Sequence, residues 1–260
     1  MTVRLWVGKG TGVRLWQVGD SGSGLPHNGL VGLWDPYRDA YGLSEAARLA
    51  LQTGTDYSGM GNHLTFGESA SASTDDPVNT GMAWQFDGGG FMTAGRPAQL
   101  EVAQPWWGFG VYYIATGTYA ALVGKHNAHY SSPSAAGFFV RINPNKTCVL
   151  FAFSGSGTIT DVSTASPLSA GWHWISYGWD GTSLIIDVDQ GNTGVVEMST
   201  YTPDVANKLT FGRYAHVEDW YFAGSIALAG FYSRFPSISE QERIKLYVRS
   251  LMAERGITLP

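Results

Sequence analysis

Residues 171–242 constrain the fold most strongly, because strand-like runs of aromatic and aliphatic residues alternate there with glycine turns. The stretch 171–192 reads GWHWISYGWDGTSLIIDVDQGN, and the groups Asp180-Gly181 and Asp189-Gln190-Gly191 divide it into three such runs. Short turns of this kind join neighbouring antiparallel strands, since glycine readily supplies positive φ. The sequence therefore predicts two consecutive β-hairpins within an antiparallel β-sandwich.

The composition of the whole chain also indicates an all-β protein. Its 260 residues include 34 Gly, 10 Trp, 13 Tyr and 12 Phe, and only 14% of residues are charged. Many short strands separated by turns give this profile, and the length suits one large β domain. The net charge of −5 gives no sign of the basic face that nucleic-acid binding needs. The sequence also lacks an apolar run of about 18 residues, the length that would predict a membrane-spanning helix. We expect a soluble protein without nucleic-acid partners or membrane insertion.

Several motifs follow one another in a fixed order. W-x-W and W-D-G come first in 171–192, followed by L-x-x-G in 209–212 and F-x-G-x-I-A in 222–227, while LVGLW, DYSGMGNH and WQFDG lie upstream. This order resembles the laminin-G-like, concanavalin-A-like lectin and glucanase jelly rolls. The resemblance implies a concanavalin A-like jelly-roll β-sandwich over residues 25–260, and it implies this fold more firmly than any activity.

The first 24 residues form a separate piece, the N-terminal arm. Val3-Arg4-Leu5-Trp6 recurs as Val13-Arg14-Leu15-Trp16, which predicts either a short hairpin or two arms packed in parallel. In both cases Arg4, Trp6, Arg14 and Trp16 lie on the opposite strand face from Val and Leu. Because a two-stranded hairpin is marginal alone, we expect the arm to dock on the sandwich, on a sister subunit in a homo-oligomer, or on a larger assembly.

Two segments carry helix signals. In residues 35–55, which depart from the family pattern, Ser44 is a candidate cap of a short helix. Near the C-terminus, Ser239 and Glu242 have the spacing of a capping box, an apolar stripe follows, and Gly256 is a stop signal. We expect this second helix to close one end of the sandwich.

Catalysis is the disfavoured interpretation. Glucanases of this fold resemblance place three acidic residues on one strand as E-x-D-x-E or E-x-D-x-x-E, and this chain lacks that pattern. Its nearest approach is Asp187-Val188-Asp189, which we interpret as a solvated strand residue and a turn residue. The lone Cys148 lies in the apolar run TCVLFAF, so we expect a buried, inert thiol. A divergent glycoside hydrolase remains the alternative to a non-enzyme.

Sugar-binding sites combine an aromatic plate with hydrogen-bonding side chains, and three places offer such groups. The first is a predicted polar loop after the strand YAALVG, and the second is the loop after LTFG, which precedes Trp220. In the third, Trp107 follows Trp106, so strand alternation predicts one inward and one outward ring. The candidate ligand residues are Trp107, Lys125, His126, Asn127, His129, Tyr130, Arg213, Tyr214 and His216. The alternative for both loops is an ordinary solvated connection, and for Trp220 the sequence favours core packing at the start of the following strand.

No cofactor is required by any motif, but the resemblance makes calcium a possible ligand, since related lectin domains often hold a rim ion. Asp56, Asn62 and Asp87 match the positions of the family's turn motifs. Structural turn roles explain the same residues without a metal, because aspartate side chains accept hydrogen bonds from nearby backbone amides. By alternation, we expect Trp172 and Trp174 to lie in the core and His173 to face outward.

The biological setting follows from resemblance alone. A lectin-like sandwich with a tryptophan-bearing arm, without disulfides and without a predicted signal peptide, resembles the laminin-G-like proteins that bacteriophages encode as tail or capsid surface components. This implies a non-catalytic, virion-associated adhesion module that binds a cell-surface glycan and contacts other virion proteins through its arm. The alternatives are a structural or decoration protein acting only through protein–protein contacts, and a cytoplasmic location.

Overall fold

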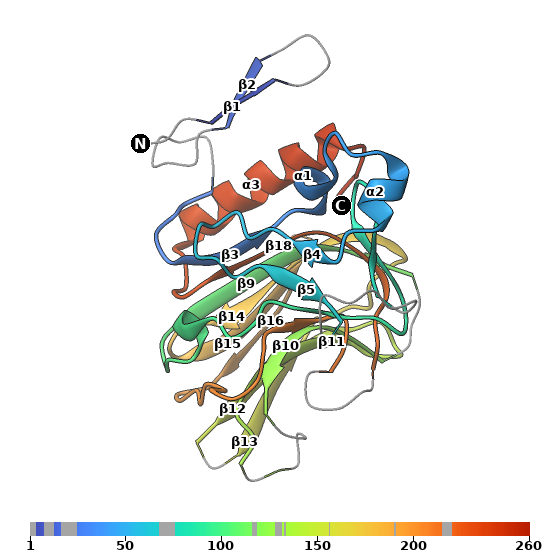
Figure 1. Ribbon diagram of the computed structural model, residues 1–260. Helices are drawn as coiled ribbons and strands as arrows, with labels where there is room; N and C mark the ends of the chain where they lie inside the picture. The colour runs from blue at the N-terminus through green and yellow to red at the C-terminus, as the bar shows by residue number, and fades with distance from the viewer. Residues whose placement is uncertain are drawn as a thin grey trace.

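A computed structural model gives the fold. It describes the backbone of residues 4–7 and 13–16 and, in full, residues 25–67, 76–115, 119–127, 132, 134–155, 157–189, 191–214 and 220–260. Two large antiparallel sheets face one another, and a long C-terminal helix lies against one of them (Figure 1). The predicted all-β sandwich is confirmed.

The two sheets are named here after their central strands. The β10 sheet contains, in spatial order, β13 (Thr158–Ser163), β12 (Cys148–Ser154), β11 (Gly137–Ile142), β10 (Ala120–His126), β17 (Thr210–Phe211), β8 (Met92–Thr93), β5 (Leu64–Phe66) and β4 (Thr53–Gly54). The β9 sheet contains β16 (Asn192–Glu197), β15 (Ser183–Val188), β14 (Gly171–Trp179), β9 (Trp106–Ile114), β18 (Ala223–Tyr232), β7 (Trp84–Asp87) and β6 (Val78–Asn79), and β3 (Leu30–Trp34) also pairs with β18. A 3₁₀ turn, η1, spans Ala98–Leu100.

The two predicted hairpins are present in the β9 sheet. Strands β14 and β15 pair antiparallel around the Asp180-Gly181 turn, where Gly181 has φ of +108°. Strands β15 and β16 pair next, with Asp189 and Gly191 both at positive φ. Local turn chemistry therefore sets the order of these three strands.

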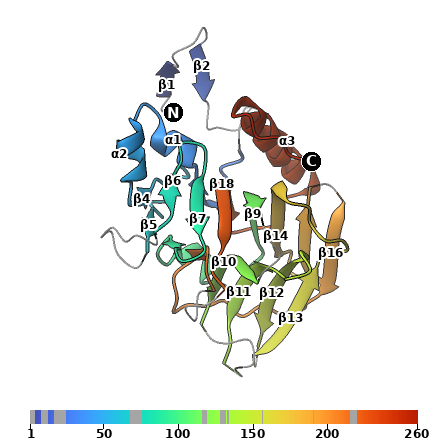
Figure 2. The same ribbon diagram turned by 90° about the vertical axis from the view of Figure 1, so that its right-hand side faces the viewer.

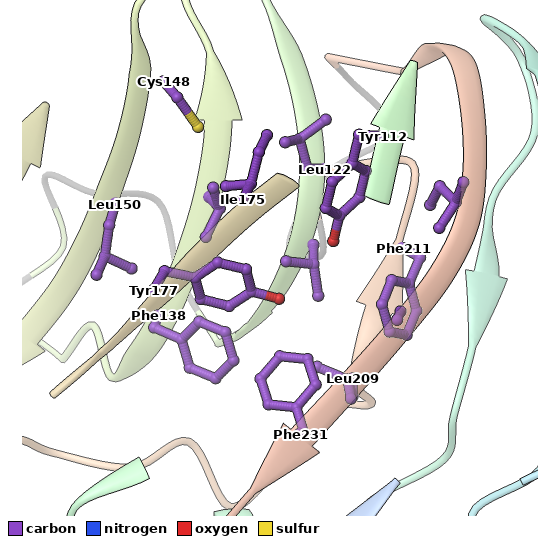
Figure 3. Close-up of a cluster of buried hydrophobic side chains, with 14 of the residues drawn as sticks. Tyr112, Leu122, Phe138, Cys148, Leu150, Ile175, Tyr177, Leu209, Phe211 and Phe231 are labelled. Atoms are coloured by element: carbon purple, nitrogen blue, oxygen red, sulfur yellow. The ribbon is translucent and has the colours of Figure 1, made fainter. Parts of the chain in front are cut away.

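The main core lies between the sheets and is rich in aromatic rings. Tyr177, Phe138 and Phe231 meet at its centre (Figure 3), and the Tyr177 and Phe231 ring centroids are 5.7 Å apart. Cys148 is fully buried in the same layer, and burial raises the pKa of its thiol. The thiol is a core side chain, as the sequence predicts.

A second apolar layer covers the other face of the β9 sheet. Helix α3 (Ile238–Glu254) lies along that face (Figure 2), and its buried Ile244, Val248 and Met252 belong to one cluster with Trp107 and Trp174. The helix therefore covers a sheet face, and the expectation that it closes one end of the sandwich is wrong. A sheet with both faces buried carries apolar residues at successive positions, which explains the near-continuous apolar run of β9.

The capping box of α3 lies two residues before the predicted one. Ser237 is the N-cap: its hydroxyl accepts from the backbone N–H of Glu240, whose carboxylate accepts from the Ser237 N–H. Arg234 donates to both carboxylate oxygens of Glu240, at 2.9 and 2.7 Å, and lowers the pKa of that carboxyl to about 2. The predicted stop is correct, since Gly256 has φ of +75° just after the helix.

The segment 35–55 forms two short helices. Helix α1 (Pro36–Ala40) is capped by Asp35, and α2 (Glu45–Leu49) is capped by Ser44, whose hydroxyl accepts from the Ala47 N–H. The predicted Ser44 cap is therefore confirmed.

The N-terminal arm contains an antiparallel hairpin of β1 (Arg4–Val7) and β2 (Val13–Trp16). This selects the hairpin over parallel arms. In the described part of the chain these strands pair only with each other, and docking of the arm stays a prediction.

Candidate ligand-binding face

The outer face of the β10 sheet carries large aromatic side chains. Along β11 and β12 the inward residues join the main core, while Phe139, Phe151 and Phe153 belong to a separate cluster on the opposite side. Phe139 and Phe151 are register partners whose rings stack with centroids 4.4 Å apart. This face carries a buried aromatic layer rather than the polar side chains expected of a solvated sheet, and of these three rings only Phe151 is partly exposed.

Arg141 stands at the centre of the exposed part of this face. Its guanidinium carbon lies 5.0 Å from the ring centre of Tyr119, 4.6 Å from that of Phe151 and 4.7 Å from that of Trp220. Its Nε donates to Asn143 Oδ1 at 3.0 Å. Cation–π attraction to three rings holds the planar group in one place.

Two of these rings form a solvent-accessible plate. Tyr119 and Trp220 stack with centroids 5.6 Å apart and an interplanar angle of 24°. Tyr119 is 47% exposed, while Trp220, Phe151 and Arg141 are partly exposed. We call Tyr119, Arg141, Phe151 and Trp220 the aromatic plate; such a surface suits the apolar face of a sugar ring.

The first two residues of the first predicted ligand loop belong to a strand. Lys125 and His126 are the last residues of β10 and are buried, at 1% and 0% exposure, so the expectation of a polar loop beginning at Lys125 is wrong. The Lys125 ammonium donates to Asn207 O at 2.7 Å and lies 3.4 Å from Glu101 Oε1. Burial lowers the pKa of Lys125, and the charges of Asp204 and Glu101 offset only part of that effect. This lysine fastens the 201–209 segment to the sheet.

Of the remaining ligand candidates in that loop, the structure describes only Asn127. The Asn127 side-chain oxygen accepts from Ala136 N at 2.8 Å, so this amide closes the β10–β11 connection. His129 and Tyr130 lie outside the described residues, and their ligand role stays a prediction.

The second predicted loop meets the first one at the same face. The Tyr214 ring lies 4.2 Å from the His126 ring and 4.6 Å from Trp220, measured between centroids. Tyr214 is itself buried, at 1% exposure, and supports the plate from below. The Arg213 guanidinium carbon lies 3.5 Å from the Phe91 ring centre, and His216 lies outside the described residues.

The expectation of an outward tryptophan at 106–107 is wrong. Trp106 stacks on Phe138 inside the sandwich, and Trp107 packs beneath α3 beside Phe109 and Trp174, so both are only 2% exposed. Strand alternation does separate the two rings, but each side of the β9 sheet is covered. Trp107 cannot stack on a glycan in this structure.

The candidate metal residues make hydrogen bonds within the protein. Both carboxylate oxygens of Asp56 are engaged: Oδ1 accepts from Leu33 N and Ser58 N, and Oδ2 from Asn62 N. The Asn62 amide donates to Val31 O, and Asp87 Oδ1 accepts from Gly89 N in a different turn. Among the described residues no group of three or more His, Cys, Asp or Glu is placed to hold a metal ion. These contacts favour turn roles, and calcium remains an untested expectation.

The acidic pair of the glycosidase alternative has structural partners. Asp187 Oδ1 accepts from Thr193 Oγ1 at 2.7 Å, and its Oδ2 lies 3.4 Å from Lys245 Nζ on α3. Asp189 Oδ2 lies 2.6 Å from His173 Nδ1, and Oδ1 accepts from Trp174 N. The two carboxylates therefore stabilise the sheet and its helix.

His173 does not face outward, since it is only 2% exposed. Its Nε2 lies 3.0 Å from the Ser169 carbonyl, opposite the Asp189 contact. The prediction failed because both faces of β14 are covered, so alternation with Trp172 and Trp174 does not imply exposure.

The His173–Asp189 pair predicts a pH-dependent stability. Burial alone lowers the pKa of His173, but hydrogen bonds to Asp189 and Ser169 and the charge of Asp189 outweigh it and raise the pKa. The stabilisation is fully present below the unfolded-state pKa of about 6.5 and is lost as pH rises through the higher folded-state pKa. We expect the unfolding free energy of the wild type to exceed that of Asp189→Asn more at pH 6 than at pH 9, measured by urea unfolding. An equal difference at both pH values contradicts this.

Sequence reasoning missed most of the plate. The sequence motifs do not point to Tyr119, Arg141 or Phe151, and they favour core packing for Trp220. A signal was nevertheless present in residues 138–142 and 148–153. In both strands the inward positions are apolar, and the alternate positions, Phe-x-Arg and Phe-x-Phe, also carry large side chains, which indicates that the outer face is not an ordinary solvated one.

No helix in the described part of the chain is long and apolar enough to span a membrane.

Comparisons with known proteins identify the fold. No family model matches the chain, and no curated protein matches its sequence. The binding domain of botulinum neurotoxin DC, in complex with SialylT, has a TM-score of 0.59 at 9% identity, over 85% of this chain and 51% of that one. Trypanosoma rangeli sialidase in complex with sialic acid has a TM-score of 0.55 at 11% identity, over 86% of this chain and 33% of that one. The chain thus spans about half the length of the neurotoxin binding domain and about a third of the length of the sialidase. At such low identities the similarity shows a shared β-sandwich fold.

Proposed function

We propose that this protein is a non-catalytic glycan-binding module that uses the outer face of its β10 sheet. The observation that carries the proposal is the aromatic plate, in which a stacked and partly exposed Tyr119–Trp220 pair flanks the guanidinium of Arg141. Aromatic faces stack on sugar rings, and a fixed guanidinium donates to hydroxyl or carboxylate oxygens.

Two further observations support this reading. One structural neighbour named above is a binding domain in complex with SialylT, and the other is a sialidase in complex with sialic acid, which supports a search for glycan ligands but not a ligand site by fold alone. The acidic residues 187 and 189, which the glycosidase alternative needs, are engaged in ion-pair and backbone contacts. A binding role accounts for the plate without a catalytic group.

The setting that we propose is a virion surface, with the N-terminal arm joining the module to its assembly. Its support is the resemblance to laminin-G-like bacteriophage proteins, together with a hairpin that pairs with neither large sheet among the described residues. The protein should then be found in purified particles by mass spectrometry. Its presence only in the host cytoplasm contradicts this setting without touching the glycan proposal.

The glycan proposal is tested on the full-length protein with an immobilised glycan panel. Removing one stacked ring should weaken binding about tenfold, since an aromatic contact contributes about 1–1.5 kcal/mol. We therefore expect Tyr119→Ala and Trp220→Ala each to lose most of the signal on every glycan that the wild type retains.

Tyr113→Ala is the matched control. Tyr113 is also an exposed tyrosine, at 37%, and also contacts a tryptophan, Trp172, at 5.4 Å between centroids, but it lies on the β9 sheet. It should bind as the wild type does. Equal losses in all three variants, or no glycan bound by the folded wild type, would leave the structural or decoration role as the better account.

A further inference from the structure

A line of four side chains crosses the outer face of the β10 sheet. The strands β10, β11, β12 and β13 lie side by side there (Figure 2). From these strands in turn come Tyr119, directly before β10, then Arg141, Phe151 and Asp161. The first three belong to the aromatic plate. Neighbouring strands lie about 4.8 Å apart, so the line is roughly 14 Å long, and a glycan that follows it has more than one ring.

Asp161 lies on the same face of the sheet as the plate. It is the register partner of Phe151, which is in turn the register partner of Phe139 on the outer face. Directly opposite residues of antiparallel strands share one face, with Cβ atoms about 4.5–5.5 Å apart. The next residue, Val162, belongs to the main core on the inner side. The Asp161 side chain therefore stands beside Phe151, at the far end of the line from Tyr119.

The Asp161 carboxylate is not used to hold the sheet together. The residue is exposed to solvent, and among the residues that the structure describes none donates a hydrogen bond to it or forms an ion pair with it. Asp187 and Asp189, by contrast, are both engaged in structural contacts. An ionised carboxylate only accepts hydrogen bonds, through two oxygens. Asp161 is thus placed to accept from the hydroxyl groups of a sugar that covers Phe151.

A chain of hydrogen bonds through the β11–β12 turn fixes Arg141 on the other side of the Phe151 ring. The Arg141 Nε donates to Asn143 Oδ1 at 3.0 Å, and the Asn143 amide donates to Thr147 Oγ1 at 3.3 Å. That hydroxyl donates to Asn145 Oδ1 at 2.8 Å. The site therefore places a hydrogen-bond donor on β11 and an acceptor on β13, with an aromatic ring between them.

We propose that an uncharged oligosaccharide lies along this line, with one ring over Phe151 whose hydroxyl groups bond Arg141 on one side and Asp161 on the other. This rests on the proposed glycan function and names the class of sugar. Arg141 attracts a carboxylate or sulfate group at this place, but Asp161 offsets that attraction, and the net charge of the chain, −5, adds repulsion. A hydroxyl group both donates and accepts, so it satisfies both ends without a charge.

Paired glycans test the proposal on the full-length protein. The probes are immobilised oligosaccharides of glucose, galactose and mannose, each beside the counterpart in which C6 is a carboxylate. We expect the wild type to bind at least one neutral glycan and to bind its acidic counterpart more weakly. Asp161→Asn should weaken binding of the neutral glycan about tenfold, because it replaces a charged acceptor by a neutral one. The same variant should strengthen binding of the acidic counterpart, whereas a folding defect would weaken both.

Glu197→Gln is the matched control. Glu197 is also an exposed carboxylate on an edge strand, β16, but it belongs to the β9 sheet, so this variant should bind every glycan as the wild type does. Equal binding by Asp161→Asn and the wild type overturns the inference, and so does a preference of the wild type for the acidic glycans. In both cases a loss of binding in Tyr119→Ala still supports the proposed function. A wild type that binds no glycan overturns both.

Discussion

Arg255→Met should lower the unfolding free energy by about 3 kcal/mol, because it removes the bidentate partner of the buried Asp35 carboxylate and leaves only Arg38 Nε, 3.3 Å from Asp35 Oδ2, as a neighbouring cation. Arg255 follows α3 and donates from Nη1 to Asp35 Oδ1 at 2.9 Å and from Nη2 to Asp35 Oδ2 at 2.6 Å. Both side chains are almost fully buried, at 3% and 1% exposure. The pair joins the C-terminal helix to the cap of α1, so its loss should also loosen the layer over Trp107. Urea unfolding followed by tryptophan fluorescence measures the effect.

Two variants decide whether the charge or the packing is responsible. Arg243→Met removes an exposed arginine from the same helix and should change stability by less than about 0.5 kcal/mol. Arg255→Met/Asp35→Asn should recover part of the loss, because asparagine is neutral and still caps α1. If the double variant is less stable than Arg255→Met alone, the cost lies in packing rather than in the charge of the buried carboxylate.

The hairpins were predictable from sequence because their turns are local. Asp180-Gly181 and Asp189-Gln190-Gly191 determine where three strands end, and no distant contact is needed for that step. The helix start shows the limit of the same reasoning. Two serine–glutamate pairs have capping-box spacing, Ser237–Glu240 and Ser239–Glu242. The first pair forms the cap, and Arg234 stabilises it by donating two hydrogen bonds to the Glu240 carboxylate. A residue outside the motif therefore selects the cap.

The failed site predictions have one physical cause. Alternation states which residues share a face of a strand, but it does not state what covers that face. Trp107 is expected outside and is covered by α3, far away in the chain, whereas His173 is enclosed by contacts with Asp189 and the Ser169 carbonyl. Conversely, His126 and Tyr214 were assigned to separate loops, and the pairing of β10 with β17 brings them together. Non-local pairing of this kind cannot be read from local periodicity.

Gly108→Ala should lower the unfolding free energy by about 3 kcal/mol, at the upper end of the usual cost of overpacking a core. Gly108 on β9 is the register partner of Tyr177 on one side and of Phe231 on the other. A Cβ there would lie 2.5 Å from Tyr177 Cε2 and 2.8 Å from Phe231 Cε1. Both rings are at the centre of the core (Figure 3), at 1% and 0% exposure, so neither has space to move into. Thermal and urea unfolding both measure the loss.

We expect the loss in Gly108→Ala to come from the clash of the new methyl group with the two rings. The alternative cause is the loss of glycine's backbone freedom, and a control variant distinguishes the two. Gly155→Ala places a Cβ with no atom within 4 Å and should change stability by less than about 0.5 kcal/mol. Combining Gly108→Ala with Tyr177→Leu should cost less than the sum of the single changes, because the smaller side chain frees the space that the methyl group needs. Strict additivity would mean that the two sites do not contact each other. Coupling of the expected sign would show that glycine occupies 108 so that rings from both neighbouring strands can close over it.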